Sequence, residues 1–184
     1  PFSTDGKTHL QANKVELKEE NTSLFIGDVV LQQADKRVEA DQAKYVKPTE
    51  EVFAQGNVNF VTPNIQIKSK TAHVNLKTDY TLLEQTEFQN VTGQGRGQAK
   101  SIEIKNANIT KLTDATYTTC EPENIDWFLK AKSITLNHES RQGSAAHAVL
   151  RFKDVPFFYF PYLRFPLGDA RLSGFLFPYI GKSK

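Results

Sequence analysis

Methionine is absent from these 184 residues, and cysteine and tryptophan each occur once. Without Met, Pro1 is not a translational start, so the sequence predicts a processed chain or a fragment of a larger one. No signal peptide remains, and no apolar run reaches the roughly 18 residues that suggest a membrane helix. The totals of 39% hydrophobic and 24% charged residues are ordinary for a folded protein, and the length is enough for one well-buried domain.

The single cysteine, Cys120, excludes zinc sites built from cysteine pairs. In a cytosolic chain, Cys120 would be a buried residue with no special role. In an exported chain, it would suggest a partner in another chain or in a missing part of this one. Composition alone leaves these alternatives open.

A strong excess of charge of either sign is also lacking. The chain has 23 Lys and Arg against 21 Asp and Glu, which gives a formal charge of +2, and its lysines are scattered. Nucleic-acid binding usually needs a clustered basic face. The sequence therefore predicts no nucleic-acid partner.

Patterns typical of catalysis, metal binding or phosphate binding are missing as well. His9, His73, His138 and His147 show no ligand spacing, which predicts that the protein has no metal site. The glycine-rich GQGRG at 93–97 precedes QAKSIEIK, which has the pattern of a strand, whereas a dinucleotide fingerprint opens a helix. Because no nucleophile is placed beside a base, we expect no enzymatic activity and no cofactor.

A repeat is present instead. A small residue, polar residues and then an apolar–x–apolar pattern recur in LQANKVEL, VEADQAKY, IQIKSKTAHV, GQAKSIEI and LKAKSITL. A second pattern recurs with nearly the same spacing; its first copy is Gly27-Asp28-Val29 and its last is Ala146-His147-Ala148. Turn-forming residues lie between the two patterns. The sequence therefore predicts about five units of about 29 residues. The small residues that mark them are Ala12, Ala40, Ser69, Ala99 and Ala131.

Within each unit, apolar and polar residues alternate, which predicts strands with one apolar face. The alternation slips by one residue after each small residue, as between Ala40 and Ala43. Such a slip implies a bulge or a corner, because side chains would otherwise change faces. We therefore expect an all-β fold of bent ribbons that stack on their copies. The outer strands, near HLQANKVEL and AVLRF, either recruit another chain or are blunted by charges such as Lys14, Glu16 and Lys18.

The apolar residues that stay in phase have two interpretations. They fill a closed core between two stacked sheets, or the sheets splay and leave an apolar groove for a lipid or acyl chain. A groove would hold lipid strongly, since each buried CH₂ contributes about 0.8 kcal/mol. The candidate groove residues are Leu10, Val15, Leu17, Val29, Leu31, Val38, Val58, Ile65, Ile67, Val74, Leu76, Phe88, Ile102, Ile104, Tyr117, Trp127, Leu129, Ile134, Leu136, Leu150 and Phe152.

The chain ends in an aromatic stretch, VPFFYFPYLRFPLGDARLSGFLFP, that begins at Val155. Prolines recur in it every five residues, and each removes a backbone donor, which breaks helical hydrogen bonding. Arg164, Asp169 and Arg171 would be costly in hydrocarbon. The stretch is therefore not a transmembrane helix.

Three features together resemble the OstA-like family of lipopolysaccharide-assembly domains, whose members include LptA, LptC and the N-terminal domain of LptD. They are the VEADQAKY and GNVNF repeat, the GQGRGQAKSIEI stretch and the aromatic ending. The resemblance implies an open β-jellyroll, or β-taco, of two stacked antiparallel sheets. It also implies that acyl chains of lipopolysaccharide arrive from LptA, docked at the N-terminal edge strands, and pass to an outer-membrane LptD barrel that contains LptE. The location would be the periplasmic face of the Gram-negative outer membrane.

The resemblance also divides the chain. Residues 1–154 would form the periplasmic domain, and residues 155–184 would lead to the barrel. Aromatic side chains of the second part would favour the bilayer interface, and its prolines would keep it irregular. Cys120, in YTTCEP, matches a family cysteine that pairs with one in the barrel, which implies a disulfide partner outside this chain.

Two other functions stay open: a stand-alone bridge protein of the LptA type, and a structural repeat domain that binds no ligand. The aromatic ending favours the domain that leads to a barrel, because a stand-alone shuttle has no use for it. The space between the sheets distinguishes a carrier from a structural domain.

Overall fold

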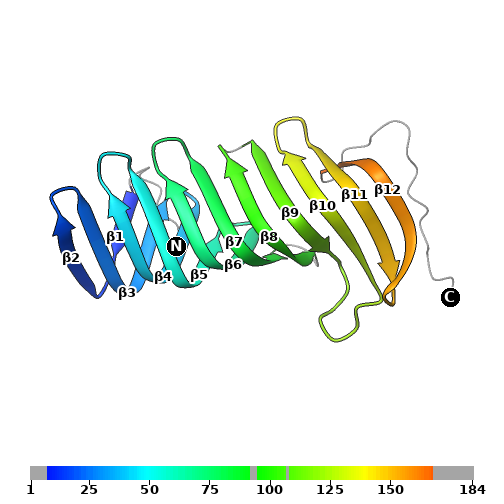
Figure 1. The fold of residues 1–184 in the computed structure, drawn as a ribbon, viewed down its shortest axis with the longest axis horizontal. Coiled ribbons are helices and arrows are strands. Elements are labelled where there is room, and N and C mark those ends of the chain that lie inside the picture. Colours follow the sequence, from blue (N-terminus) through cyan, green and yellow to red (C-terminus); the bar gives the residue numbers. More distant parts are fainter. Residues whose placement is uncertain (1–7, 92–94, 107, 168–184) are drawn as a thin grey trace.

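The strands of this protein lie side by side in one long row, from β2 at one end to β12 at the other (Figure 1). The computed structural model describes residues 8–91, 95–106 and 108–167. The strands are β1 (Thr8–Gln11), β2 (Lys14–Glu19), β3 (Thr22–Gln33), β4 (Lys36–Val46), β5 (Glu51–Val61), β6 (Ile65–Asn75), β7 (Tyr80–Asn90), β8 (Arg96–Lys105), β9 (Ile109–Tyr117), β10 (Trp127–Asn137), β11 (Gln142–Phe152) and β12 (Val155–Pro166).

Each strand from β3 onward pairs antiparallel with the next, so the chain forms a meander. No membrane-spanning helix is found among the described residues. The predicted all-β class with antiparallel strands in an open arrangement is confirmed. Hydrogen bonds join all twelve strands into a single sheet, so the two layers expected from the sequence are halves of the same bent strands. The number of repeats stays a prediction.

The strands bend where the sequence predicted a corner. The register between β3 and β4 shifts between Ile26 and Val29, and the register between β5 and β6 shifts between Gln55 and Val58. Farther along, single residues with positive φ occupy the bend: Gln85, Asp114 and His147. The predicted small residues lie directly beside these bends, since Ala40 pairs with Val29, Ser69 with Val58, Ala99 with Thr86 and Ala131 with Ala148.

The bend divides the sheet into two layers, which we call layer 1 and layer 2 and define by the strand segments that they contain. Layer 1 holds β1, β3 from Val29 onward and β4 as far as Ala40. Layer 2 holds β2, β3 as far as Ile26 and β4 from Gln42 onward. Later strands divide in the same way, and β1 and β2 act as one interrupted edge strand because both pair with β3.

Glycine is required at the bend of β5. Gly56 has a φ of 77°, and a Cβ on it would lie 2.5 Å from a carboxylate oxygen of Asp41. That carboxylate accepts a hydrogen bond of 2.9 Å from Asn57. An equivalent contact joins Asn13 to Asp28 at the bend of β3, also at 2.9 Å. The positive φ and the close approach explain why glycine occurs here.

Asparagine closes three hairpins of layer 2. The side chain of Asn75 accepts hydrogen bonds from the backbone N–H groups of Lys77 and Thr78. Asn106 and Asn137 accept equivalent bonds from the backbone N–H groups of Asn108 and Ser140, respectively. Such side-chain bonds to the following backbone stabilise tight turns, which agrees with the turn segments predicted here.

Candidate functional site

The space between the two layers is lined by apolar side chains from both. Its centre is well packed: Leu83, Ala115 and Ala148 are fully buried, and Phe60 and Ile102 nearly so. Eight of the candidate groove residues belong to this buried cluster. They are Val29, Leu31, Val38, Val58, Ile67, Val74, Ile102 and Ile134.

Seven further candidates are partly buried and pack against that cluster. They are Leu10, Ile65, Leu76, Phe88, Ile104, Leu129 and Leu136. The structure thus brings fifteen of the predicted residues together around one interior, eight in the cluster and seven against it.

The remaining six candidates lie at the margins. Val15 and Leu17 pair with Phe25 and Ser23 in layer 2, yet they are 53% and 83% exposed. Phe152 is likewise exposed at the opposite end, whereas the other three are half-buried. Those three are Tyr117, Trp127 and Leu150.

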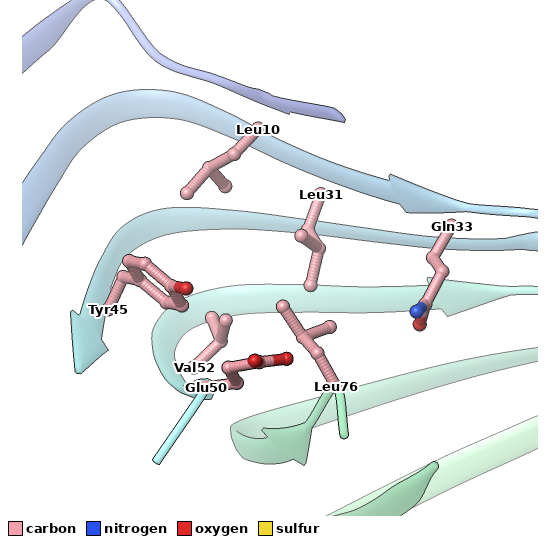
Figure 2. Close-up of a pocket in the computed structure, with 7 residues that line it drawn as sticks. All are labelled: Leu10, Leu31, Gln33, Tyr45, Glu50, Val52 and Leu76. Atoms are coloured by element: carbon pink, nitrogen blue, oxygen red, sulfur yellow. The ribbon is translucent and has the colours of Figure 1, made fainter. Parts of the chain in front are cut away.

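Open space lies at the N-terminal end of the interior. A cavity of about 440 Å³ is lined from layer 1 by Leu10, Leu31 and Gln33. The side chains of Leu10 and Leu31 point across it toward those of layer 2 (Figure 2). The layer 2 lining residues are Tyr45, Glu50, Val52 and Leu76.

Only three of these lining residues were predicted: Leu10, Leu31 and Leu76. Tyr45 lies after the bend of β4, and Val52 lies before the bend of β5. At each bend, the alternation of buried residues changes phase. The sequence contained the signal. Tyr45 is two residues from Ala43 and Val52 is two residues from Ala54, so each continues the alternation of its own strand segment. Applying the predicted slip to both sides of each bend would have identified them.

Beside this cavity, the interior narrows sharply. The next space measures only about 10 Å³ and lies between Leu31, Val38 and Phe60 of layer 1 and Val74 and Thr81 of layer 2. Its rim is closed by an ion pair between Lys36 and Asp79. Leu10, Leu31 and Leu76 give the wider space an apolar side that suits a hydrocarbon chain, and Gln33 and Glu50 add polar groups to its wall.

The histidines hold structural contacts on the outside of the sheet. His73 stacks on Phe53 at 4.4 Å between ring centroids, and its Nε2 lies 3.0 Å from Glu51. Hydrogen bonds from Thr49 and His73 lower the pKa of Glu51. His147 bonds to Tyr159 at 2.7 Å. Among the described residues, no three His, Cys, Asp or Glu side chains gather where they could hold a metal ion.

Cys120 lies in the connection between β9 and β10. It is a free thiol, half-buried, with its Sγ 3.8 Å from the carbonyl oxygen of Trp127. Burial acts to raise the pKa of this thiol, but hydrogen bonds with Thr118 and with the backbone of Trp127 and Asp126 outweigh it, so the pKa is lowered. The predicted disulfide with a partner outside the chain stays a prediction.

The aromatic ending forms a strand where the sequence suggested an irregular segment. Residues Val155–Pro166 make β12, which pairs with β11 over both layers. Proline is tolerated there because β12 is an edge strand, whose second side needs no donors. The expectation of irregularity was therefore wrong for this part. The stretch beyond Leu167 lies outside the described residues.

Comparison with known proteins gives consistent matches. Residues 9–142 match the family described as LptA/(LptD N-terminal domain) LPS transport protein. The LPS-assembly protein LptD of Hahella chejuensis is 40% identical over 157 residues, which cover 85% of this chain and 20% of that protein. LptD of Methylococcus capsulatus is 34% identical over 175 residues, 95% of this chain and 17% of that protein. The chain spans about a fifth of the length of these relatives.

A solved structure also aligns with the chain. It is LptH, described as the LptA-homologous periplasmic component of the lipopolysaccharide transport device of Pseudomonas aeruginosa. The alignment covers 57% of this chain and 80% of LptH, with 16% identity and a TM-score of 0.47.

Proposed function

Because this chain belongs to the LptA/LptD N-terminal domain family of lipopolysaccharide transport proteins, we propose that its interior binds the acyl chains of lipopolysaccharide. The observation that carries the proposal is the cavity of about 440 Å³ between the layers. Leucine, tyrosine and valine side chains line it from both sides. Each CH₂ that enters such a space from water contributes about 0.8 kcal/mol, so an acyl chain needs no polar contact to be held there.

The open N-terminal end supports a route of entry. Val15 and Leu17 extend the inner face of layer 2 beyond the cavity, and they are exposed. Among the described strands, β1 and β2 pair with β3 and form one end of the sheet, and such an edge can pair with a strand of another chain. We propose that LptA docks at this edge and delivers lipid into the cavity.

The C-terminal end supports a route of exit. Around β12, aromatic side chains are exposed on the strand, including Phe157, Phe158, Tyr159 and Tyr162. Tyrosine side chains favour membrane interfaces, because the ring is apolar and the hydroxyl is polar. We propose that residues 155–184 lead to an outer-membrane barrel with LptE and that Cys120 pairs with a cysteine there. The location would be the periplasmic face of the outer membrane.

In this mechanism, the domain is passive. It lowers the free energy of acyl chains between two membranes and performs no bond chemistry, and the direction of movement comes from energy supplied elsewhere. The alternative is a structural domain that binds no ligand. The tight packing around Leu83 and Ile102 favours that alternative for the centre of the interior, whereas the N-terminal cavity does not.

Photocrosslinking tests the proposal with a matched pair of positions. Tyr45 lines the cavity, and Phe53 is an aromatic residue on the outer face of the neighbouring strand. We expect p-benzoylphenylalanine at position 45 to crosslink to purified lipopolysaccharide and the same group at position 53 to give little product. Equal yields at the two positions, or none at position 45, would contradict binding in the interior.

A further inference from the structure

An ion pair joins the two layers at their free ends. Lys36 begins β4 at the tip of layer 1, and Asp79 lies in the turn before β7 at the tip of layer 2. Both side chains border the same narrow space as Phe60 and Val74, which belong to opposite layers. The pair therefore crosses the mouth of the interior.

The other ion pairs of the described residues have a different arrangement. Lys14–Glu16, Arg37–Glu39 and Lys105–Glu103 each join residues of one strand. His73–Glu51 joins neighbouring strands of layer 2. These contacts lie within a single layer, whereas Lys36–Asp79 connects the two layers.

The position of this pair coincides with the change in width of the interior. The space beneath it is about 10 Å³, and the adjoining space toward the N-terminal end is about 440 Å³. Leu31 and Gln33 line both. Separating the tips of the layers would therefore extend the wide cavity past Phe60 and Val74 toward the centre of the molecule.

We propose that Lys36 and Asp79 form a clasp that holds the mouth of the interior closed and that must break before an acyl chain moves inward from the N-terminal cavity. The identity of the ligand as an acyl chain rests on the proposed function, whereas the opening of the two layers does not depend on it. The two side chains are 25% and 41% exposed. Partly exposed ion pairs are weak and screened by salt, which makes the contact reversible.

The opening can be measured without any lipid. Spin labels would be attached at Asn64→Cys and Thr78→Cys, exposed turn positions of layer 1 and layer 2, in a Cys120→Ser background. Double electron–electron resonance then reports the distance between the layers. We expect Asp79→Asn to lengthen or broaden the distance distribution and the exchange of charges, Lys36→Asp with Asp79→Lys, to restore it.

The matched control is Glu16→Gln, which removes the carboxylate of a pair that lies within one strand. It should leave the distribution unchanged, and circular dichroism should show the same fold in every variant. High salt should widen the distribution of the parent chain and have little effect in Asp79→Asn. A distribution in Asp79→Asn that matches the parent and the control would overturn the clasp.

A second measurement separates this inference from the proposed function. Uptake of dodecyl maltoside below its critical micelle concentration should be about two- to fivefold faster in Asp79→Asn, which is the effect of losing a partly exposed ion pair. Layers that separate without faster uptake would contradict control of inward movement by the clasp, whereas no uptake in any variant would contradict acyl-chain binding itself. Layers that do not separate would overturn the clasp, whatever the uptake.

Discussion

Gly97 of β8 lies where an added side chain would meet the neighbouring strands. A Cβ at this position would lie 1.9 Å from the carbonyl oxygen of Thr116 in β9 and 2.7 Å from the ring of Phe88 in β7. The first of these contacts is with backbone, which a side-chain rotation cannot relieve. Gly97 therefore serves packing between strands, and it lies in β8, where the sequence predicted a strand.

The substitution Gly97→Ala should destabilise the fold. We expect a loss of about 1–3 kcal/mol in the free energy of unfolding, because added atoms in a tightly packed place force the backbone apart. Urea denaturation followed by circular dichroism measures this loss. Gln89→Ala, an exposed residue paired with Arg96 in the same part of the sheet, is the control and should change stability by less than about 0.5 kcal/mol. Equal midpoints for the two variants would contradict the packing argument.

Some of the residues that form the bends could be predicted from the sequence, and others could not. Gly27 and Gly56 have positive φ, and the sequence repeat located both. Gln85 and Asp114 also have positive φ. Aspartate is one of the residue types enriched in that conformation, but glutamine is not, so the residue type at position 85 gave no local signal.

Among the elements, β12 differs most from expectation. Its inner side chains Phe160, Leu163 and Phe165 pack against the buried cluster, and Phe165 covers Gly143 of β11. The family resemblance implied a domain boundary after Asp154, where the stretch rich in proline and aromatic residues begins. The burial of one face was not predicted, because it follows from the register with which β12 pairs with β11, and the repeat pattern did not extend to this stretch.

Truncation tests where the folding unit ends. A chain that stops at Asp154 should unfold at a lower urea concentration than one that stops at Leu167. The difference should be about 3 kcal/mol or more, because burial of each large apolar side chain contributes about 1.5–3 kcal/mol. The chain that stops at Leu167 is the control, because both variants lack residues 168–184 and they differ only in residues 155–167. Identical midpoints would instead place the end of the folding unit at residue 154.

Considered as a whole, the molecule is tightest in the middle and loosest at its N-terminal end. Centrally placed strands such as β6 pair on both sides and carry buried residues on the inner face. In the described part of the chain, β3 is the strand that pairs with β1 and β2, and Val15 and Leu17 of β2 are exposed. The sequence predicted the inner face but not this gradient, because local alternation does not report how far the layers separate.

Hydrogen exchange should follow this gradient. Amides of Lys14–Glu19 should exchange at least about tenfold faster than those of Ile65–Asn75, because local opening is easiest where few apolar contacts hold the backbone. Mass spectrometry of peptic fragments would measure the rates. β12 is the internal control, since it is also an edge strand but is packed on its inner face. Addition of LptA should slow exchange in β2, and uniform rates across the sheet would contradict the gradient.

The two free edges of the sheet are chemically unlike. One carries Lys14 and Glu16 on a short interrupted strand, and the other is a long strand rich in proline and aromatic rings. Copies or relatives added strand to strand would therefore meet head to tail, since neither end matches itself. A filament assembled by this rule has a polarity fixed by the difference between the two edges, before any lipid or energy source acts on it.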